Sequence, residues 1–302
     1  MDASLYKLFS ALSQGFAFAF FTIGVAIAFR WLKYPDLTGD GSFTLGAVVT
    51  AKLLDMGFTV WLAIPVSMIS GLIAGMLTYS MYRFLKVPKI LTGVLMMMAL
   101  YSVNLRILGR PNLQVLRENS ILSILPDTSG YEGAFFGFLL YGFLIIVVSV
   151  LSYVFLDSKS GLILRIAGAN PKLAILNGIS KHRLILGLGL ANLFIALSGS
   201  LIAQRSYNAD IHMGMGQVIV AIAALFIGMI LFRKLSASHL IFASIAGSII
   251  YMVLMQLALD IGIQAQDFRL ISTLIVLLSI LVALKSTKGT VLRKGADIFG
   301  ID

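Results

Sequence analysis

Cysteine is absent from this chain of 302 residues, and charged residues are scarce. The absence of cysteine excludes disulfides, thiolate metal sites and cysteine nucleophiles. The three histidines lie far apart in the sequence, at His182, His212 and His239, and none has the spacing of a helical zinc motif. We therefore expect neither a metal site nor a cofactor in this chain.

Motifs for nucleotide chemistry and for catalysis are missing as well. No glycine-rich, lysine-containing phosphate loop is present, which excludes ATP binding by that route. No Ser, His and Asp arrangement supports nucleophilic catalysis, and we expect the chain not to be an enzyme. The glycine pairs Gly187/Gly189 and Gly214/Gly216 do not follow a strand of a nucleotide-binding fold, so we interpret them as helix-packing positions.

Long apolar runs dominate what is present. Hydrophobic residues make up 59% of the chain and charged residues 12%, against roughly a quarter charged in soluble domains. A helix needs about 20 apolar residues to cross a bilayer. Runs of this kind lie near residues 10–31, 59–82, 90–109, 133–156, 183–204, 214–232, 237–258 and 268–285. With a shorter run at 42–54, they predict one all-α domain over 1–302, a polytopic membrane helical bundle of about nine (eight to ten) transmembrane segments.

The net charge of +10 is attributed to Lys and Arg in the loops. Nucleic-acid binding is not expected, because no basic stripe with interleaved aromatic residues is present. When the runs cross alternately, most of the 23 Lys and Arg fall on one side, which is typical of the cytoplasmic side. This predicts an N-terminus outside and a C-terminus inside, although a re-entrant segment at 42–54 would reverse the N-terminus. The first run continues to Trp31, too long for a signal-peptide core, and is expected to be retained.

A polar, glycine-containing stretch precedes the short run. Gly39 and Gly41 are expected to break a helix there, and short or broken apolar segments are typical of a transporter's discontinuous helix. Free helix ends beside a cavity would suit a zwitterionic substrate. The residues predicted to border the substrate pathway are Asp36, Thr38, Asp40 and Ser42. The alternative is that both aspartates lie at the cytoplasmic interface, solvated or paired with Arg30 and Lys33.

Asn104 and Arg106 lie toward the outer end of the run at 90–109. They are candidates for the outer mouth of the same pathway, where they would meet an anionic or zwitterionic substrate. Snorkelling and hydrogen bonding between loops is the alternative interpretation.

A basic island at 157–183 separates two long apolar runs. It contains Lys159, Arg165, Lys172, Lys181 and Arg183. In its centre, an N-cap residue, a first-turn proline and a helix-stopping glycine stand at 170, 171 and 178, so a short surface helix is expected over 170–178. A capped helix in a cytoplasmic loop predicts a docking site for a partner.

Small residues also recur at four-residue spacing within the runs. The pairs Gly71/Gly75, Ala196/Ser200 and Ala243/Gly247 are expected at close helix contacts.

Several motifs together resemble a known family. They are Gly161-Leu162-x-x-Arg165-x-x-Gly168-x-Asn170-Pro171-x-x-Ala174-x-x-x-Gly178-Ile179, Asp36-Leu37-Thr38-x-x-x-Ser42, and Ala196-x-Ser198-Gly199-x-Leu201-x-Ala203-Gln204. The chain resembles, over residues 10 to 290, the permease subunits of bacterial ABC importers of the branched-chain amino acid, ribose and galactose group. Leu100 to Arg106, followed by Gly109-Arg110-Pro111-Asn112, is similar to the branch implicated in tryptophan and tyrosine uptake.

The resemblance implies a multi-pass permease in the bacterial inner membrane that moves a small organic solute, an aromatic or branched-chain amino acid. It implies a separate ATPase subunit that binds ATP, a second permease subunit (a homodimer), an extracytoplasmic substrate-binding protein and surrounding lipid. The residues it assigns to ATPase coupling are Arg165, Gly168, Asn170, Pro171, Leu173, Ala174, Leu176 and Gly178. One departure is Met229, where relatives usually carry Glu.

Two other functions remain open from the residues alone. A secondary transporter driven by an ion gradient would need intramembrane carboxylates, for which only Asp36 and Asp40 qualify, and usually an inverted repeat. A structural scaffold would explain the hydrophobicity but not the capped helix of the island.

Overall fold

The computed structural model describes residues 2–126, 131–169, 182–232 and 237–264, together with 176, 267, 270–274 and 277–278. The helices are α1 (Asp2–Ala26), α2 (Thr38–Asp55), α3 (Val60–Phe84), α4 (Lys89–Leu108), α5 (Tyr131–Asp157), α6 (Lys159–Ala169), α8 (His182–Ser206), α9 (Gln217–Leu231) and α10 (Ala237–Asp260). A π-helical turn, η1 (Ile27–Trp31), continues α1, and the 3-10 turns η2 (Arg117–Asn119) and η3 (Ile121–Ile124) follow α4.

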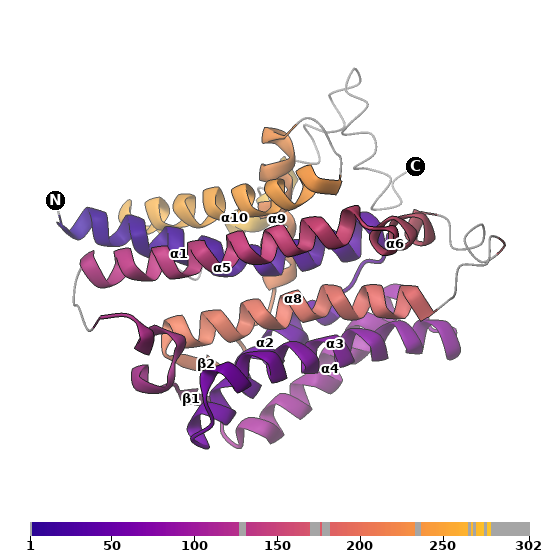
Figure 1. Ribbon diagram of the computed structural model, residues 1–302, viewed down its shortest axis with the longest axis horizontal. Coiled ribbons are helices and arrows are strands. Elements are labelled where there is room, and N and C mark those ends of the chain that lie inside the picture. Colours follow the sequence, from indigo (N-terminus) through magenta and orange to yellow (C-terminus); the bar gives the residue numbers. More distant parts are fainter. Residues whose placement is uncertain are drawn as a thin grey trace.

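The long helices run roughly along one axis of the molecule (Figure 1). One end carries the N-terminus, the start of α5 and a small antiparallel pair of strands, β1 (Asn112–Gln114) and β2 (Asn208–Asp210), in which Leu113 faces Ala209. The opposite end carries α6 and the start of α8. We refer to these as the β1–β2 end and the α6 end.

Six helices in the described part of the chain are long and apolar enough to cross a membrane. They are Ser4–Trp31, Val60–Phe84, Lys89–Leu108, Tyr131–Phe155, Arg183–Ser206 and His239–Asp260. The predicted all-α bundle is confirmed, but the predicted count of about nine is not. α2 carries Asp40, Lys52 and Asp55 within 18 residues, α9 has only 15, and most of the predicted run 268–285 lies outside the described residues.

Two helices form the centre of the bundle. Most of α1 and α8 is buried, whereas α3, α4 and α5 each bury only one face and expose large apolar side chains. On a membrane-spanning helix such side chains face lipid or another subunit. The bundle is thus a buried core pair surrounded by helices suited to the bilayer.

Close contacts between these helices depend on the small residues. A Cβ on Gly46 would lie 2.0 Å from the Ala196 carbonyl oxygen, and one on Gly71 would lie 2.4 Å from Ala196 Cβ. A Cβ on Gly247 would lie 1.9 Å from the Ala224 carbonyl oxygen, and Ser200 Oγ accepts a hydrogen bond from Thr50 Oγ1 at 2.7 Å. The packing role predicted for these positions is confirmed.

Three of the four glycines in the two pairs act at close contacts, as predicted, whereas Gly216 has another role. A Cβ on Gly187 would lie 2.6 Å from Leu164 Cδ1, and one on Gly189 would lie 2.8 Å from Met76 Cγ. Gly214 leaves room for the backbone of α2, since its Cβ would lie 2.0 Å from the Asp40 carbonyl oxygen. Gly216 adopts φ +77° at the N-cap of α9, a conformation that glycine adopts without strain.

The predicted position of the helix break is wrong. Gly39 and Gly41 lie inside the first turn of α2, and the irregular backbone is instead at 32–37, after the π-helical turn. The two glycines admit neighbouring chains: their Cβ atoms would lie 3.0 Å from Val218 Cγ2 and 2.9 Å from Leu100 Cδ1, respectively. Glycine at a helix start can therefore signal close packing as well as a break.

Candidate functional site

A buried carboxylate holds the irregular segment between α1 and α2. Asp36 is 1% exposed. Its Oδ1 accepts the Thr38 backbone N–H at 2.9 Å, and its Oδ2 accepts Asn192 Nδ2 of α8 at 2.7 Å. Asn192 lies ten residues into α8, about 15 Å from the α6 end of that helix. The side chain of Asp36 is therefore not solvated, and its carboxylate links the break to the central helix α8.

Two further side-chain contacts close the segment on its other sides. Thr38 Oγ1 lies 3.0 Å from Thr78 Oγ1 of α3. The Tyr34 hydroxyl lies 2.5 Å from Thr92 Oγ1 of α4, and the Lys89 ammonium lies 5.7 Å from the Tyr34 ring centroid while donating to the Lys33 carbonyl at 3.0 Å. The break is thus fastened to α3, α4 and α8 together.

Asp40 caps a second helix. Its carboxylate accepts the backbone N–H groups of Gly216 and Val218, each at 2.8 Å, so it satisfies the free N-terminus of α9. The positive end of the α9 dipole favours a carboxylate in this place. Thr44 Oγ1 donates to the Asp40 carbonyl at 3.1 Å, which fixes the same turn of α2.

Of the remaining predicted pathway residues, Asn104 lies beside the turn that carries Ser42, whereas Arg106 lies apart. Ser42 is fully buried, and Asn104 is 1% exposed and donates from Nδ2 to the Gly41 carbonyl at 3.3 Å. Within the described part of the chain, Ser42 Oγ and Asn104 Oδ1 have no hydrogen-bond partner. Arg106 instead lies on the exposed face of α4. Asn104 and Arg106 therefore point in different directions rather than forming one mouth.

A pocket of about 460 Å³ lies between α1, α8, α9, α10 and the segment after β2. Its inner wall is apolar, with Phe18, Phe43 and Met252 among the lining residues, and Asn208 and Asp210 line it from β2. The volume lies in the range of about 300–1,000 Å³ typical of small-molecule sites. The pocket is not lined by the predicted pathway residues Asp36, Thr38, Asp40 and Ser42. It is lined by Phe43, which follows Ser42, and by Gly216, whose N–H is accepted by Asp40.

The basic island contains a helix that sequence reasoning did not identify. α6 covers 159–169, and Gly168 packs so closely on η1 that a Cβ would lie 2.0 Å from the Trp31 carbonyl oxygen. Arg165 is half-buried on α6, and Leu176 is 84% exposed. The remaining predicted coupling residues, Asn170, Pro171, Leu173, Ala174 and Gly178, lie outside the described residues, so the helix over 170–178 stays a prediction.

Other residues of the site were not foreseen. Asn192 and Thr78 make central contacts, and the signal that could have found them is a polar side chain inside an apolar run. Met229, the one departure noted from the family that the sequence resembles, is 3% exposed in the main core cluster. In the described residues, no group of three or more His, Asp or Glu side chains is placed to hold a metal ion.

Comparisons with known proteins agree over nearly the whole chain. The family described as "Branched-chain amino acid transport system / permease component" matches residues 7–284. A "Tyrosine transport system permease protein" of Clostridioides difficile (strain R20291) is 31% identical over 271 residues, which cover 89% of each chain. An uncharacterized protein of Rickettsia prowazekii (strain Madrid E) is 34% identical over 278 residues, 90% of this chain and 96% of that protein. No solved structure matches.

Proposed function

Because the chain belongs to the family of branched-chain amino acid transport system permease components, we propose that it is the membrane-spanning subunit of an ABC importer. It is a multi-pass membrane protein, placed by this proposal in the bacterial inner membrane. A separate ATPase subunit binds and hydrolyses ATP, a second copy of the chain completes the pathway, and an extracytoplasmic binding protein delivers the solute. No nucleic acid takes part.

We assign an aromatic or branched-chain amino acid, and first of all tyrosine, as the solute. The relative from C. difficile carries tyrosine transport in its name and is similar over 89% of both chains, and this observation carries the assignment. The 460 Å³ pocket supports it, since Phe18, Phe43 and Met252 suit an aromatic side chain and Asp210 suits an ammonium group.

A continuous set of contacts connects the basic island to this pocket. α6 packs on η1 through Gly168, and η1 leads into the segment that Asp36 fastens to α8. α2 then begins, and Asp40 on its first turns holds the start of α9, which lines the pocket. In this proposal, ATPase movements act on the coupling residues of 165–178 and reach the pathway through α6, η1, α2 and α9.

The test combines transport with ATP hydrolysis. The chain, purified with the ATPase subunit that accompanies it, is reconstituted into proteoliposomes, and uptake of labelled tyrosine and leucine is measured with ATP, without ATP and with an ion gradient alone. ATP-dependent uptake is expected. Uptake driven by an ion gradient without ATP would instead identify a secondary transporter.

The Asp40 contact offers a variant for the same assay. Asp40→Asn removes the charge at the α9 N-terminus, and we expect uptake to fall about tenfold while the ATPase remains active. Asp55→Asn is the matched control, because Asp55 is an exposed carboxylate at the other end of α2. Equal uptake by the Asp40 variant and the Asp55 control would remove Asp40 from the pathway.

A further inference from the structure

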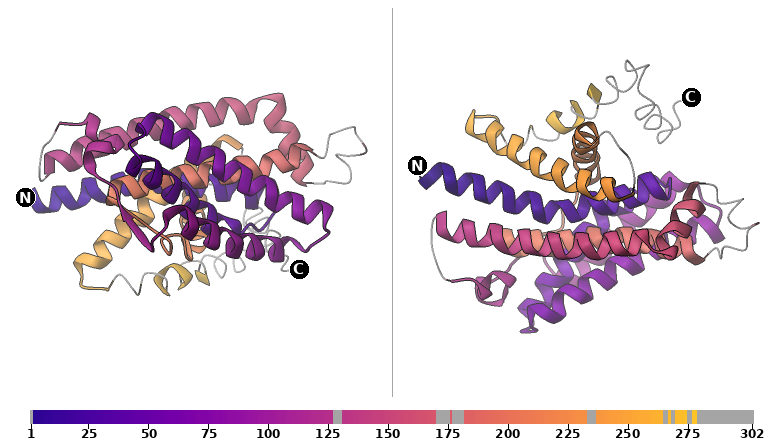
Figure 2. Two further views of the ribbon diagram at one scale, coloured as in Figure 1. Left: turned by 90° about the horizontal axis from the view of Figure 1, so that it is seen from below. Right: turned by 45° about the horizontal axis from the view of Figure 1, so that its top comes forward.

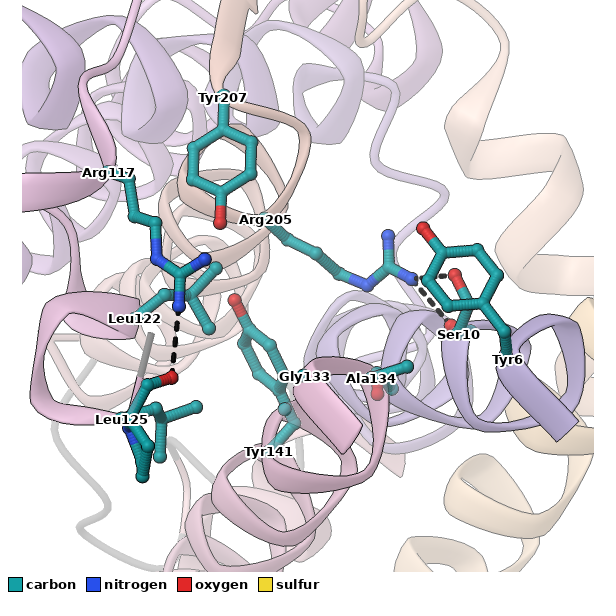
Figure 3. A pocket seen from close by; sticks show the side chains of 13 residues that line it. Tyr6, Ser10, Arg117, Leu122, Leu125, Gly133, Ala134, Tyr141, Arg205 and Tyr207 are labelled. Carbon is teal, nitrogen blue, oxygen red and sulfur yellow. Dashed lines mark hydrogen bonds between the residues drawn. The ribbon is translucent and has the colours of Figure 1, made fainter. Parts of the chain in front are cut away.

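A second pocket, of about 280 Å³, lies at the β1–β2 end between the first turns of α1 and α5, the end of α8 and the η2–η3 segment. Figure 3 shows two arginines, Arg117 and Arg205, on either side of it, with the hydroxyls of Tyr141 and Tyr207 projecting between them. No acidic side chain is among the described residues that line it. The pocket is therefore cationic and rich in hydrogen-bond donors.

Arg205 is the partly buried cation of this pocket. Its Nη2 donates to the carbonyl and hydroxyl oxygens of Ser10, at 2.6 and 2.7 Å. Among the described residues, no carboxylate lies within salt-bridge distance of its guanidinium. A guanidinium held by neutral acceptors beside a cavity leaves its charge available to an anionic ligand.

Tyr207 has a strained backbone in the same place. Its φ is +52°, which is uncommon for a bulky residue, and its carbonyl accepts the Val115 N–H at 2.9 Å. This turn directs its phenol toward the pocket (Figure 3). The opposite wall, on α5, is made of small residues: a Cβ on Gly137 would have no heavy atom nearer than 3.9 Å. The strain and the small residues together keep the space open and lined with donors.

Two apolar cavities lie farther along α5 and share no lining residue with this pocket. One, of about 210 Å³, is lined by Leu144 and Val148 of α5 and by Leu201, one turn before Arg205. The next, of about 250 Å³, shares Val148 and is lined by Leu190 of α8. Leu201 and Leu190 are eleven residues apart, about 16 Å along the helix, close to the roughly 15 Å hydrocarbon depth of one leaflet.

We propose that the pocket at Arg205 and the two apolar cavities together form a groove that binds one phospholipid. The phosphate lies at Arg205 and the Tyr207 hydroxyl, and an acyl chain fills the apolar cavities beside Val148. A free anion would occupy only the pocket at Arg205. An acidic side chain of another protein would not extend into the two apolar cavities. The aromatic rings of Phe9 and Phe135, 5.2 Å apart at the same end, fit the depth of a membrane interface.

The test measures lipid retained by the purified full-length chain. After delipidation, dioleoylphosphatidylglycerol is added back, and bound phospholipid is counted by native mass spectrometry. Arg205→Gln should weaken retention about fivefold, as expected for one cation at a headgroup. Arg110→Gln, an exposed arginine at the same end, should have no effect. Val148→Trp should displace the acyl chain with Arg205 intact, whereas Val147→Trp, on an exposed position, should not.

Three results would overturn the proposal. The first is unchanged retention in both Arg205→Gln and Val148→Trp. The second is the same rise in Tm with inorganic phosphate as with the phospholipid, which would identify a free-anion site. The third is cross-linking of a cysteine at Val148 to a second copy, which would identify a protein interface. If the Arg205 variant fails to fold, Tyr207→Phe replaces it in the retention test, because this change removes only a hydroxyl. Reduced phospholipid retention by the Tyr207 variant supports the proposal.

Discussion

At the scale of single residues, buried polar side chains hold the irregular segment between α1 and α2. Asp36 and Asn192 form a hydrogen bond, and both side chains are almost fully buried. A buried polar group that loses its hydrogen-bond partner costs about 1–3 kcal/mol. We therefore expect this hydrogen bond to stabilise the geometry of the irregular segment at 32–37.

Exchanging the two residues tests this pair. Asn192→Asp places two carboxylates in contact and should lower stability by roughly 2–3 kcal/mol, seen as a lower Tm of the detergent-solubilised chain. The double variant Asp36→Asn with Asn192→Asp restores one carboxylate and one amide, and we expect it to recover more than half of that loss. A double variant no more stable than Asn192→Asp would mean that the contact is not a stabilising pair.

At the scale of elements, α6 docks on η1 through one of the close glycine contacts of the molecule. Gly168 allows the backbone of α6 to meet the Trp31 carbonyl, and η1 is a π-helical turn, a feature frequent at functional sites. η1 leads directly into the segment that Asp36 holds. A shift of α6 must therefore either move η1 or change the hydrogen bonds of that segment.

A side chain at position 168 should therefore disconnect the two elements. Gly168→Val forces α6 away from η1, at a cost of about 1–3 kcal/mol, and we expect ATP hydrolysis to continue without uptake. Ile166→Val is the matched control, because it places the same side chain at a 42% exposed position of α6 and should leave transport unchanged. Full uptake by the Gly168 variant would show that α6 does not carry the coupling.

The elements themselves were largely predictable, but their contacts were not. Apolar runs placed the long helices correctly, because a bilayer requires length and hydropathy that are readable locally. The Asp36–Asn192 hydrogen bond joins residues 156 positions apart, and no local pattern pairs them. The Gly39 and Gly41 positions were misread because their neighbours, Val218 and Leu100, come from distant helices. α6 was missed although Ser158 precedes it as an N-cap residue, whose Oγ accepts the Gly161 N–H at 3.5 Å.

At the scale of the whole molecule, the fold separates two chemically different ends. The β1–β2 end holds the large pocket and the pocket of Arg205, and the α6 end holds α6 with Arg30, Lys33 and Lys89. Successive long helices connect these ends in alternation (Figures 1 and 2). An importer needs such an arrangement, because solute arrives at one face and ATPase subunits act at the other.

The orientation of these ends in the membrane is the remaining prediction, and α3 offers a matched test. The chain has no cysteine, so Met56→Cys and Leu85→Cys each introduce a single thiol, at 62% and 67% exposed positions flanking opposite ends of α3. The excess of Lys and Arg toward the α6 end predicts that this end faces the cytoplasm. In spheroplasts, an impermeant maleimide should label the cysteine at 56 and leave the one at 85 unlabelled until the cells are lysed. Labelling of position 85 alone would invert the molecule and place the basic island outside, where no ATPase could reach it.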